Sequence, residues 1–155
     1  MRSLPDEVSQ ELREYYARVV NGRTIVLLPP ADGIKFYNGG GAIVLHREGQ
    51  FQCELMFSQR DIEVAAHRHP HVESLDIMIS GDVYAERNGV MEVSPKPPRP
   101  NGVAHDFMRP HPFPLNSLHA GAAGARGGCV LMVQRWLHGV KPTSVTDDQG
   151  DLDAI

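Results

Sequence analysis

The chain has 155 residues, 41% of them hydrophobic and 22% charged, which is the composition of one ordinary globular domain rather than of a disordered segment. Its 15 lysines and arginines face 19 aspartates and glutamates, and no basic stripe is visible, so nucleic acid is not expected as a partner. No stretch approaches ~18 apolar residues and no apolar leader is visible, so we expect a cytoplasmic protein that does not enter a membrane. Cys53 and Cys129 are far apart and fit reduced core thiols.

The first predicted element is an amphipathic helix over residues 4–20. Ser3 suits its N-cap, and Asn21-Gly22 suits its end. Its apolar side chains recur at spacings of three and four and form one stripe: Leu4, Val8, Leu12, Tyr15, Tyr16 and Val19. We expect this N-terminal extension, residues 1–22, to pack on the rest of the domain or on a partner subunit.

From residue 23 to 140 the pattern changes to short β-type segments, and an acidic tail follows over residues 141–155. The expected strands are Thr24–Leu28, Ala42–His46, Phe51–Phe57, Ile62–His67, Val72–Ile79, Val83–Glu86, Val90–Val93, Val103–Phe107, Leu115–His119 and Cys129–Leu137. The glycine-rich runs Asn38–Gly41 and Gly121–Gly128 are expected to be loops. Many short strands at this spacing predict a sandwich, a jelly roll or a small barrel.

Imidazole and carboxylate side chains gather in two segments, and these are ligands of borderline transition metals. The first segment holds His67, His69 and Glu73, and the second holds His105 after a turn sequence. Strand alternation places Glu73 on the same face as its apolar neighbours, and His105 on the inward face of the later strand. The apolar face is expected to point inward, so a carboxylate there must be neutralised, and a metal ion does that.

These two segments resemble the two motifs of the cupin family, small jelly-roll barrels with a metal in the barrel mouth. The first motif reads Gly-x5-His-x-His, three or four residues, Glu, six residues and Gly. Here Asp61 replaces the opening glycine, and seven residues separate Glu73 from Gly81. The second motif is matched by Pro100–His105 in its Pro-x-Gly-x2-His part. Its outer positions are replaced, by Ser94 and Arg109.

The resemblance implies an all-β fold, a cupin jelly-roll barrel behind an N-terminal amphipathic helix. It also implies one divalent transition metal per chain (Fe, Mn, Ni, Co or Zn). The implied ligands are His67, His69, Glu73 and His105. Counting back from Gly81 puts the acidic position on Ser74, so a three-histidine site with Glu73 outside the ligand set stays open, as does a cupin without metal.

Other polar residues are candidates for catalytic or ligand-binding roles beside the metal. His119 and His111 follow the second motif and are candidate acid/base residues. His71 is a further ligand candidate, or a residue of the surface. Gln134 and Trp136 share a face of the last strand and either line the pocket or pack against the helix.

The sequence predicts a small-molecule metalloenzyme with dioxygenase-, isomerase- or cyclase-like chemistry, because four protein ligands leave one or two positions open on a six-coordinate ion. The alternative is a non-catalytic binding or accessory protein, in which the metal holds a ligand or braces the barrel. The expected partners are a small-molecule ligand or substrate and, by resemblance to cupins, a second copy of the chain in a homodimer.

Overall fold

The computed structural model describes residues 4–21, 34–37, 39–86, 102–104 and 109–143. Within these ranges the chain forms one helix, α1 (Gln10–Asn21), and eight strands. The strands are β1 (Ile34–Tyr37), β2 (Gly40–Glu48), β3 (Phe51–Ser58), β4 (Glu63–His67), β5 (Val72–Glu86), β6 (Gly102–Ala104), β7 (Pro110–Phe113) and β8 (His119–Trp136). Among the described residues α1 is the one helix, and it is neither long nor apolar enough to cross a membrane.

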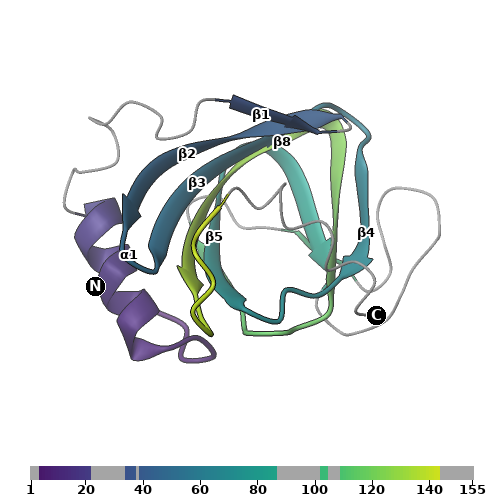
Figure 1. Cartoon of the computed structure of the whole chain (residues 1–155). Helices are drawn as coiled ribbons and strands as arrows, with labels where there is room; N and C mark the ends of the chain where they lie inside the picture. Colours follow the sequence, from purple (N-terminus) through teal and green to yellow (C-terminus); the bar gives the residue numbers. More distant parts are fainter. Residues whose placement is uncertain (1–3, 22–33, 38, 87–101, 105–108, 144–155) are drawn as a thin grey trace.

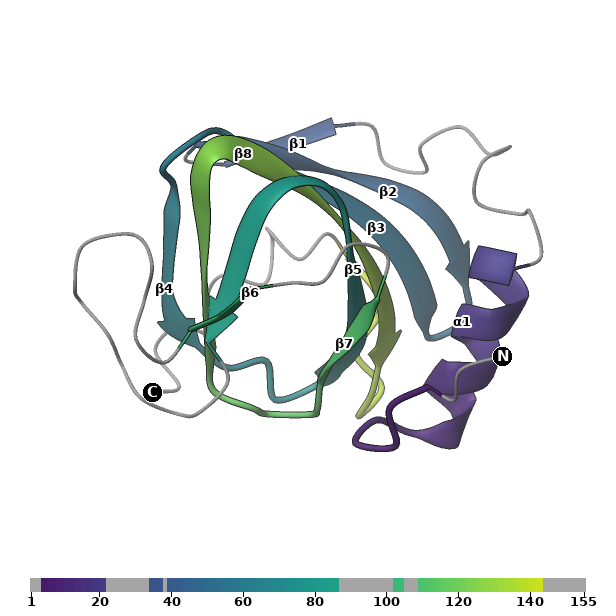
Figure 2. The ribbon, with the colours of Figure 1, turned by 180° about the vertical axis from the view of Figure 1, so that it is seen from behind.

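All eight strands belong to one antiparallel sheet. The order is β1-β2-β3-β8-β5-β6, while β4 pairs with β8 and β7 pairs with β5. Figures 1 and 2 show that this sheet curls into a barrel and that α1 lies on its outside, beside β2 and β3. The predicted all-β barrel with an N-terminal helix is therefore confirmed.

Several predicted strand boundaries were wrong. β5 joins two predicted strands into one bent strand, and β1 and β7 were not predicted. The predicted strand Leu115–His119 is a turn up to residue 118. The predicted strands over 24–28 and 90–93 lie outside the described residues.

The predicted loop Gly121–Gly128 is instead part of β8, and close strand packing explains its composition. A Cβ on Gly128 would lie 2.2 Å from Cγ2 of Val83, and a Cβ on Gly81 would lie 2.3 Å from the carbonyl oxygen of Gly127. The register of β5 against β8 shifts at the same place, between Met78 and Val83. The glycines therefore allow two long strands to bend together at the corner of the barrel.

The main apolar core lies between α1 and the outer face of the sheet. Its buried members come from α1 and the turn before it, β3, β5 and β8: Val8, Leu12, Tyr15, Tyr16, Val19, Cys53, Leu75, Ile77, Leu131 and Val133. The alternate residues of the same strands face the barrel interior, and many of these are polar. The apolar face of β5 thus points out of the barrel, toward the helix, and not toward the interior as predicted.

The helix begins at Gln10 and not at Leu4, and its N-cap is Ser9. The Oγ atom of Ser9 accepts a hydrogen bond from the backbone N–H of Leu12 at 3.2 Å, the usual bond of an N-cap. The predicted cap, Ser3, lies outside the described residues. Val8 is still buried in the apolar core, because the turn before the helix carries it there.

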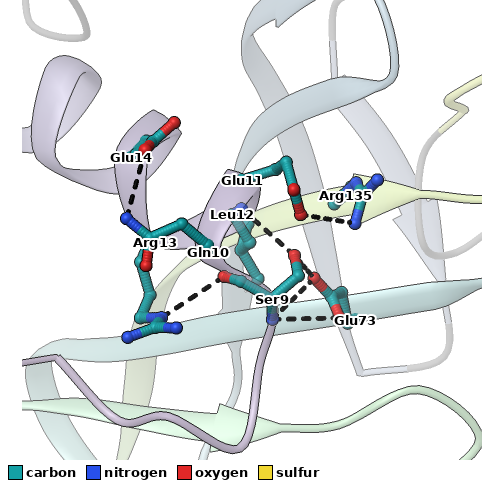
Figure 3. Close-up of polar contacts among 8 residues, drawn as sticks. All are labelled: Ser9, Gln10, Glu11, Leu12, Arg13, Glu14, Glu73 and Arg135. Atoms are coloured by element: carbon teal, nitrogen blue, oxygen red, sulfur yellow. Dashed lines mark hydrogen bonds and ion pairs between the residues drawn. The ribbon is translucent and has the colours of Figure 1, made fainter.

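Glu73 binds this helix start. The backbone N–H of Ser9 donates to both carboxylate oxygens of Glu73, at 3.2 and 3.4 Å, and the Ser9 hydroxyl donates to Oε1 (Figure 3). A helix N-terminus carries partial positive charge and free N–H groups, so it neutralises a buried carboxylate. The prediction that a metal does this for Glu73 was wrong, since its side chain lies on the outer face of the sheet.

We expect Glu73→Ala to lower the free energy of unfolding by about 2–3 kcal/mol, because it removes charge-assisted hydrogen bonds from the buried cap. Urea unfolding followed by circular dichroism measures this loss. The matched control is Glu14→Ala on the exposed side of α1, where a change within about 0.5 kcal/mol is expected. Equal stability of the two variants would contradict the capping role of Glu73.

Candidate metal centre

Three histidines meet at one end of the barrel interior. His67 is the last residue of β4, His69 lies two residues further on, and His119 is the first residue of β8. One ring nitrogen from each lies within 4.8 Å of the other two. The ring centroids are 4.4 Å apart for His67 and His119, and 4.7 Å apart for His67 and His69.

Strand pairing and turn contacts bring these histidines together. His67 and His119 are direct partners in the antiparallel ladder between β4 and β8. The carbonyl oxygen of His69 accepts hydrogen bonds from the N–H groups of Asn116 at 3.1 Å and Val72 at 3.4 Å. The turn that carries His69 is thereby tied to the turn that leads into His119.

Backbone carbonyls fix the orientation of two of the rings. The Nδ1 atom of His67 lies 2.7 Å from the carbonyl oxygen of Ala65, and Nδ1 of His119 lies 3.0 Å from that of Ser117. Because a carbonyl oxygen can only accept, each Nδ1 carries the proton and donates it. In the neutral form of each ring Nε2 is then the unprotonated nitrogen, which is the kind of atom that binds a metal in proteins.

The electrostatics of the site also favour the neutral form of His119. Burial, together with the neighbouring His67 and His69, lowers the pKa of His119 to about 3. Metal ligation requires an unprotonated ring nitrogen, so no proton has to be displaced from Nε2 near neutral pH. Three nitrogens bonded to one ion at 2.0–2.1 Å lie roughly 3–4 Å apart, and the three ring nitrogens lie within 4.8 Å of one another here. The residues present therefore fit a borderline transition metal.

The structure brings together only part of the predicted ligand set. His67 and His69 lie in the cluster, and His119, predicted as an acid/base residue, lies there with them. Glu73 lies on the other face of the sheet, at the start of α1. His105 lies outside the described residues.

The remaining predicted histidines lie elsewhere. His111 is buried on β7, opposite Asp76 in the register, and it is not part of the cavity wall among the described residues. His71 packs against Trp136, with ring centroids 5.4 Å apart. Neither residue joins the three-histidine cluster.

The cluster opens onto a cavity of about 130 Å³ inside the barrel. Its walls are mainly apolar and include Met56, Val72, Val83, Phe113, Val130 and Met132. Besides the histidines, its polar groups include Ser74, Asp76 and Gln134. Asp76 was not predicted as a site residue, although the alternation of β5 and the count back from Gly81 to Ser74 both indicate this face.

Gln134 is held in place by a buried network. Its Oε1 atom accepts hydrogen bonds from Nε2 of Gln52 and from Nε1 of Trp136, both at 3.1 Å, and its Nε2 donates to Glu54 at 3.2 Å. The open question about the last strand is thus answered. The Gln134 side chain lines the cavity, and Trp136 supports it from the same face.

Asp76 is the cavity residue with the least satisfied polar atom. Its Oδ1 is buried and has no hydrogen-bond partner among the described residues. The pKa of Asp76 is raised to about 7, mainly by burial; a hydrogen bond from Ser74 opposes the rise, and the negative charge of Glu54 adds to it. The cavity therefore holds a carboxyl group whose charged form is not stabilised by the protein alone.

No protein-family model matches the sequence, and no curated protein matches it. Among solved structures the chain is similar to KdgF from Halomonas sp., with a TM-score of 0.54 and 10% identity over 68% of this chain and 87% of that one. It is also similar to an RmlC-like cupin from Shewanella frigidimarina NCIMB 400, with a TM-score of 0.54 and 12% identity over 73% and 93%.

A third similar structure is the cupin domain of Schizosaccharomyces pombe Cnp3, with a TM-score of 0.53 and 7% identity over 77% of this chain and 75% of that one. At these identities the likeness concerns the fold. The chain therefore has the fold of the cupin superfamily, as its two motifs predicted.

The raised pKa of Asp76 predicts a loss of stability as the pH rises. Its pKa is about 7 in the folded chain and about 3.9 when unfolded, so the folded state binds more protons between these values. From about pH 5 to about pH 8 the wild type should lose roughly 2–3 kcal/mol relative to Asp76→Asn. Urea unfolding across this range measures the difference.

Asp82→Asn is the matched control for this experiment. Hydrogen bonds from Arg126 hold the pKa of Asp82 below its usual value, so removing this carboxyl should not flatten the fall in stability. Parallel pH profiles for the wild type and Asp76→Asn would contradict the raised pKa.

Proposed function

We propose that this chain is a metal-binding cupin in which His67, His69 and His119 hold one divalent transition metal, and that it is a small-molecule metalloenzyme. The observation that carries the proposal is the geometry of the three rings. Their ring nitrogens lie within 4.8 Å of one another, two of the rings are oriented by backbone carbonyls, and all three lie beside a cavity of about 130 Å³. His105 keeps its predicted place as a fourth ligand.

Different residues of the chain would have different roles in such a site. When bound, the ion would supply a Lewis acid, or a binding position for dioxygen, at the coordination positions that the protein leaves open. The apolar wall would exclude bulk water from these positions. Ser74, Asp76 and Gln134 are polar residues on the rest of the wall that can orient a bound molecule. Reaction types of the dioxygenase, isomerase and cyclase kind all fit this division.

The second candidate is a non-catalytic cupin in which the metal braces the barrel. One observation favours it: His67 and His119 are direct partners across β4 and β8, so an ion held by both would link these strands. A bracing site is closed by protein ligands, whereas a catalytic site keeps an open position. The two candidates therefore differ in whether outside ligands reach the ion.

Metal content per chain tests the ligand assignment. We expect one equivalent in the wild-type protein purified without chelator, and loss of nearly all of it in His67→Ala and in His119→Ala. His71→Ala is the matched control, because His71 lies in the same run of histidines but packs on Trp136. Inductively coupled plasma mass spectrometry measures the content, and circular dichroism checks the fold.

Two results would contradict the assignment. One is a full equivalent of metal in His119→Ala, and the other is a similar loss of metal in His71→Ala. Retention of metal by Glu73→Ala is expected, since its carboxylate caps α1. The content of His105→Ala shows whether a fourth histidine ligates.

An anion titration of the cobalt(II) form distinguishes a catalytic metal site from one that only braces the barrel. At an open position, added azide is expected to change the visible absorption spectrum of the ion, with saturation at one azide per chain. A spectrum that stays unchanged up to excess azide would favour the bracing role. The Met132→Leu variant, which alters the cavity wall but no ligand, should behave as the wild type does.

A further inference from the structure

The cavity has polar groups from two different parts of the barrel, and only one of them is the histidine cluster. Asp76 lies on the inner face of β5, in one row with Met132 of β8 and Glu54 of β3. The histidines come from β4, the following turn and the start of β8. Both groups line the same cavity of about 130 Å³, so one small molecule can touch both.

The hydrogen bonds of Asp76 indicate that its carboxyl group lacks one donor. Ser74 donates a hydrogen bond to its carboxyl group, while Oδ1 has no partner among the residues described. Gln134, the nearest amide on the wall by register, donates to Glu54 instead. A buried carboxylate oxygen without a donor is unfavourable, and a donor on a bound molecule would remove that penalty.

The positive charge of a metal ion at the histidine cluster favours an anionic group on the bound molecule. Neutral imidazoles leave the full charge of a divalent ion uncompensated, and the acidic position of the first motif is occupied here by Ser74. A carboxylate is a good ligand for such an ion. The wall between the two groups is apolar, with Met56, Val130 and Met132 among its residues. A molecule of roughly six to eight non-hydrogen atoms fits, because a ~150 Å³ apolar cavity holds benzene.

We propose that the cavity binds a small carboxylate with an apolar body and a hydroxyl or ammonium group, the carboxylate lying at the histidine-bound metal and the donor on Oδ1 of Asp76. Asp76 is then the residue that selects hydroxy or amino acids over plain carboxylic acids. The inference rests on the proposed function, because the carboxylate end requires the metal.

Matched probes of one shape test this selection. The parent is 3-methylbutanoate, and the donor probes are its 2-hydroxy, 3-hydroxy, 2-amino and 3-amino derivatives. Each is titrated by calorimetry into wild-type protein that carries one equivalent of Zn²⁺, at about pH 8, where Asp76 is mostly ionised. At least one donor probe is expected to bind about 10-fold or more tightly than the parent, as a hydrogen bond to a charged group allows.

Variants locate the source of the preference. Asp76→Ala should reduce the ratio of donor probe to parent to about 2-fold or less while leaving the affinity for the parent within a few-fold. Asp76→Asn keeps an acceptor oxygen but no charge, so it should retain part of a hydroxyl preference and lose an ammonium preference. Asp82→Asn, which removes a carboxyl outside the cavity wall, is the matched control and should keep the wild-type ratio.

The outcomes separate this inference from the proposed function. Zn²⁺-loaded protein that binds the parent as well as every donor probe, or that binds none of them, would overturn the selection by Asp76 and leave the metal site standing. A preference that survives in Asp76→Ala would overturn it too. A chain that retains no Zn²⁺ would instead overturn the proposed function.

Discussion

The packing of α1 on the outside of the sheet is the contact on which the rest of the structure depends. Leu12 and Tyr15 of the helix and Leu75 and Val133 of the sheet are fully buried there. Each large apolar side chain buried in this way contributes about 1.5–3 kcal/mol. Because the helix covers the apolar face, the hydrophobic core of this chain lies beside the barrel, and the barrel interior does not have to supply it.

This division allows the interior to carry groups that a hydrophobic core would exclude. Glu54 and Gln134 are fully buried, and a hydrogen bond joins them. His67 and His69 of the histidine cluster are buried as well. Unlike these, Asp76 keeps a buried oxygen without a partner among the described residues, at a penalty to the charged form. Buried polar groups left unsatisfied by the protein are common where a ligand completes them, and the cavity lies directly at Asp76.

The sequence predicted local features well, but it failed for features that depend on contacts between elements far apart in sequence. The alternation of Glu73 and Ser74 was correct, and so was the grouping of His67 with His69. The direction of the two faces was wrong, because only the position of α1 determines which face is outside. His119 could not be assigned to the cluster, since the pairing of β4 with β8 joins residues far apart in sequence. The glycines that allow close strand packing give this part of β8 the composition of a loop, and it was predicted as one.

The exchange of roles between Glu73 and Ser74 links the helix to the chemistry of the site. The motif's spacing to Gly81 places Ser74 where cupins carry their acidic ligand, and Ser74 lines the cavity. The carboxylate is one residue earlier, on the opposite face, where it binds the N-terminus of α1. The same pair of residues thus anchors the helix and removes an anionic ligand from the proposed metal site. An ion held by imidazoles alone keeps its full positive charge, and its affinity for an anionic ligand is correspondingly high.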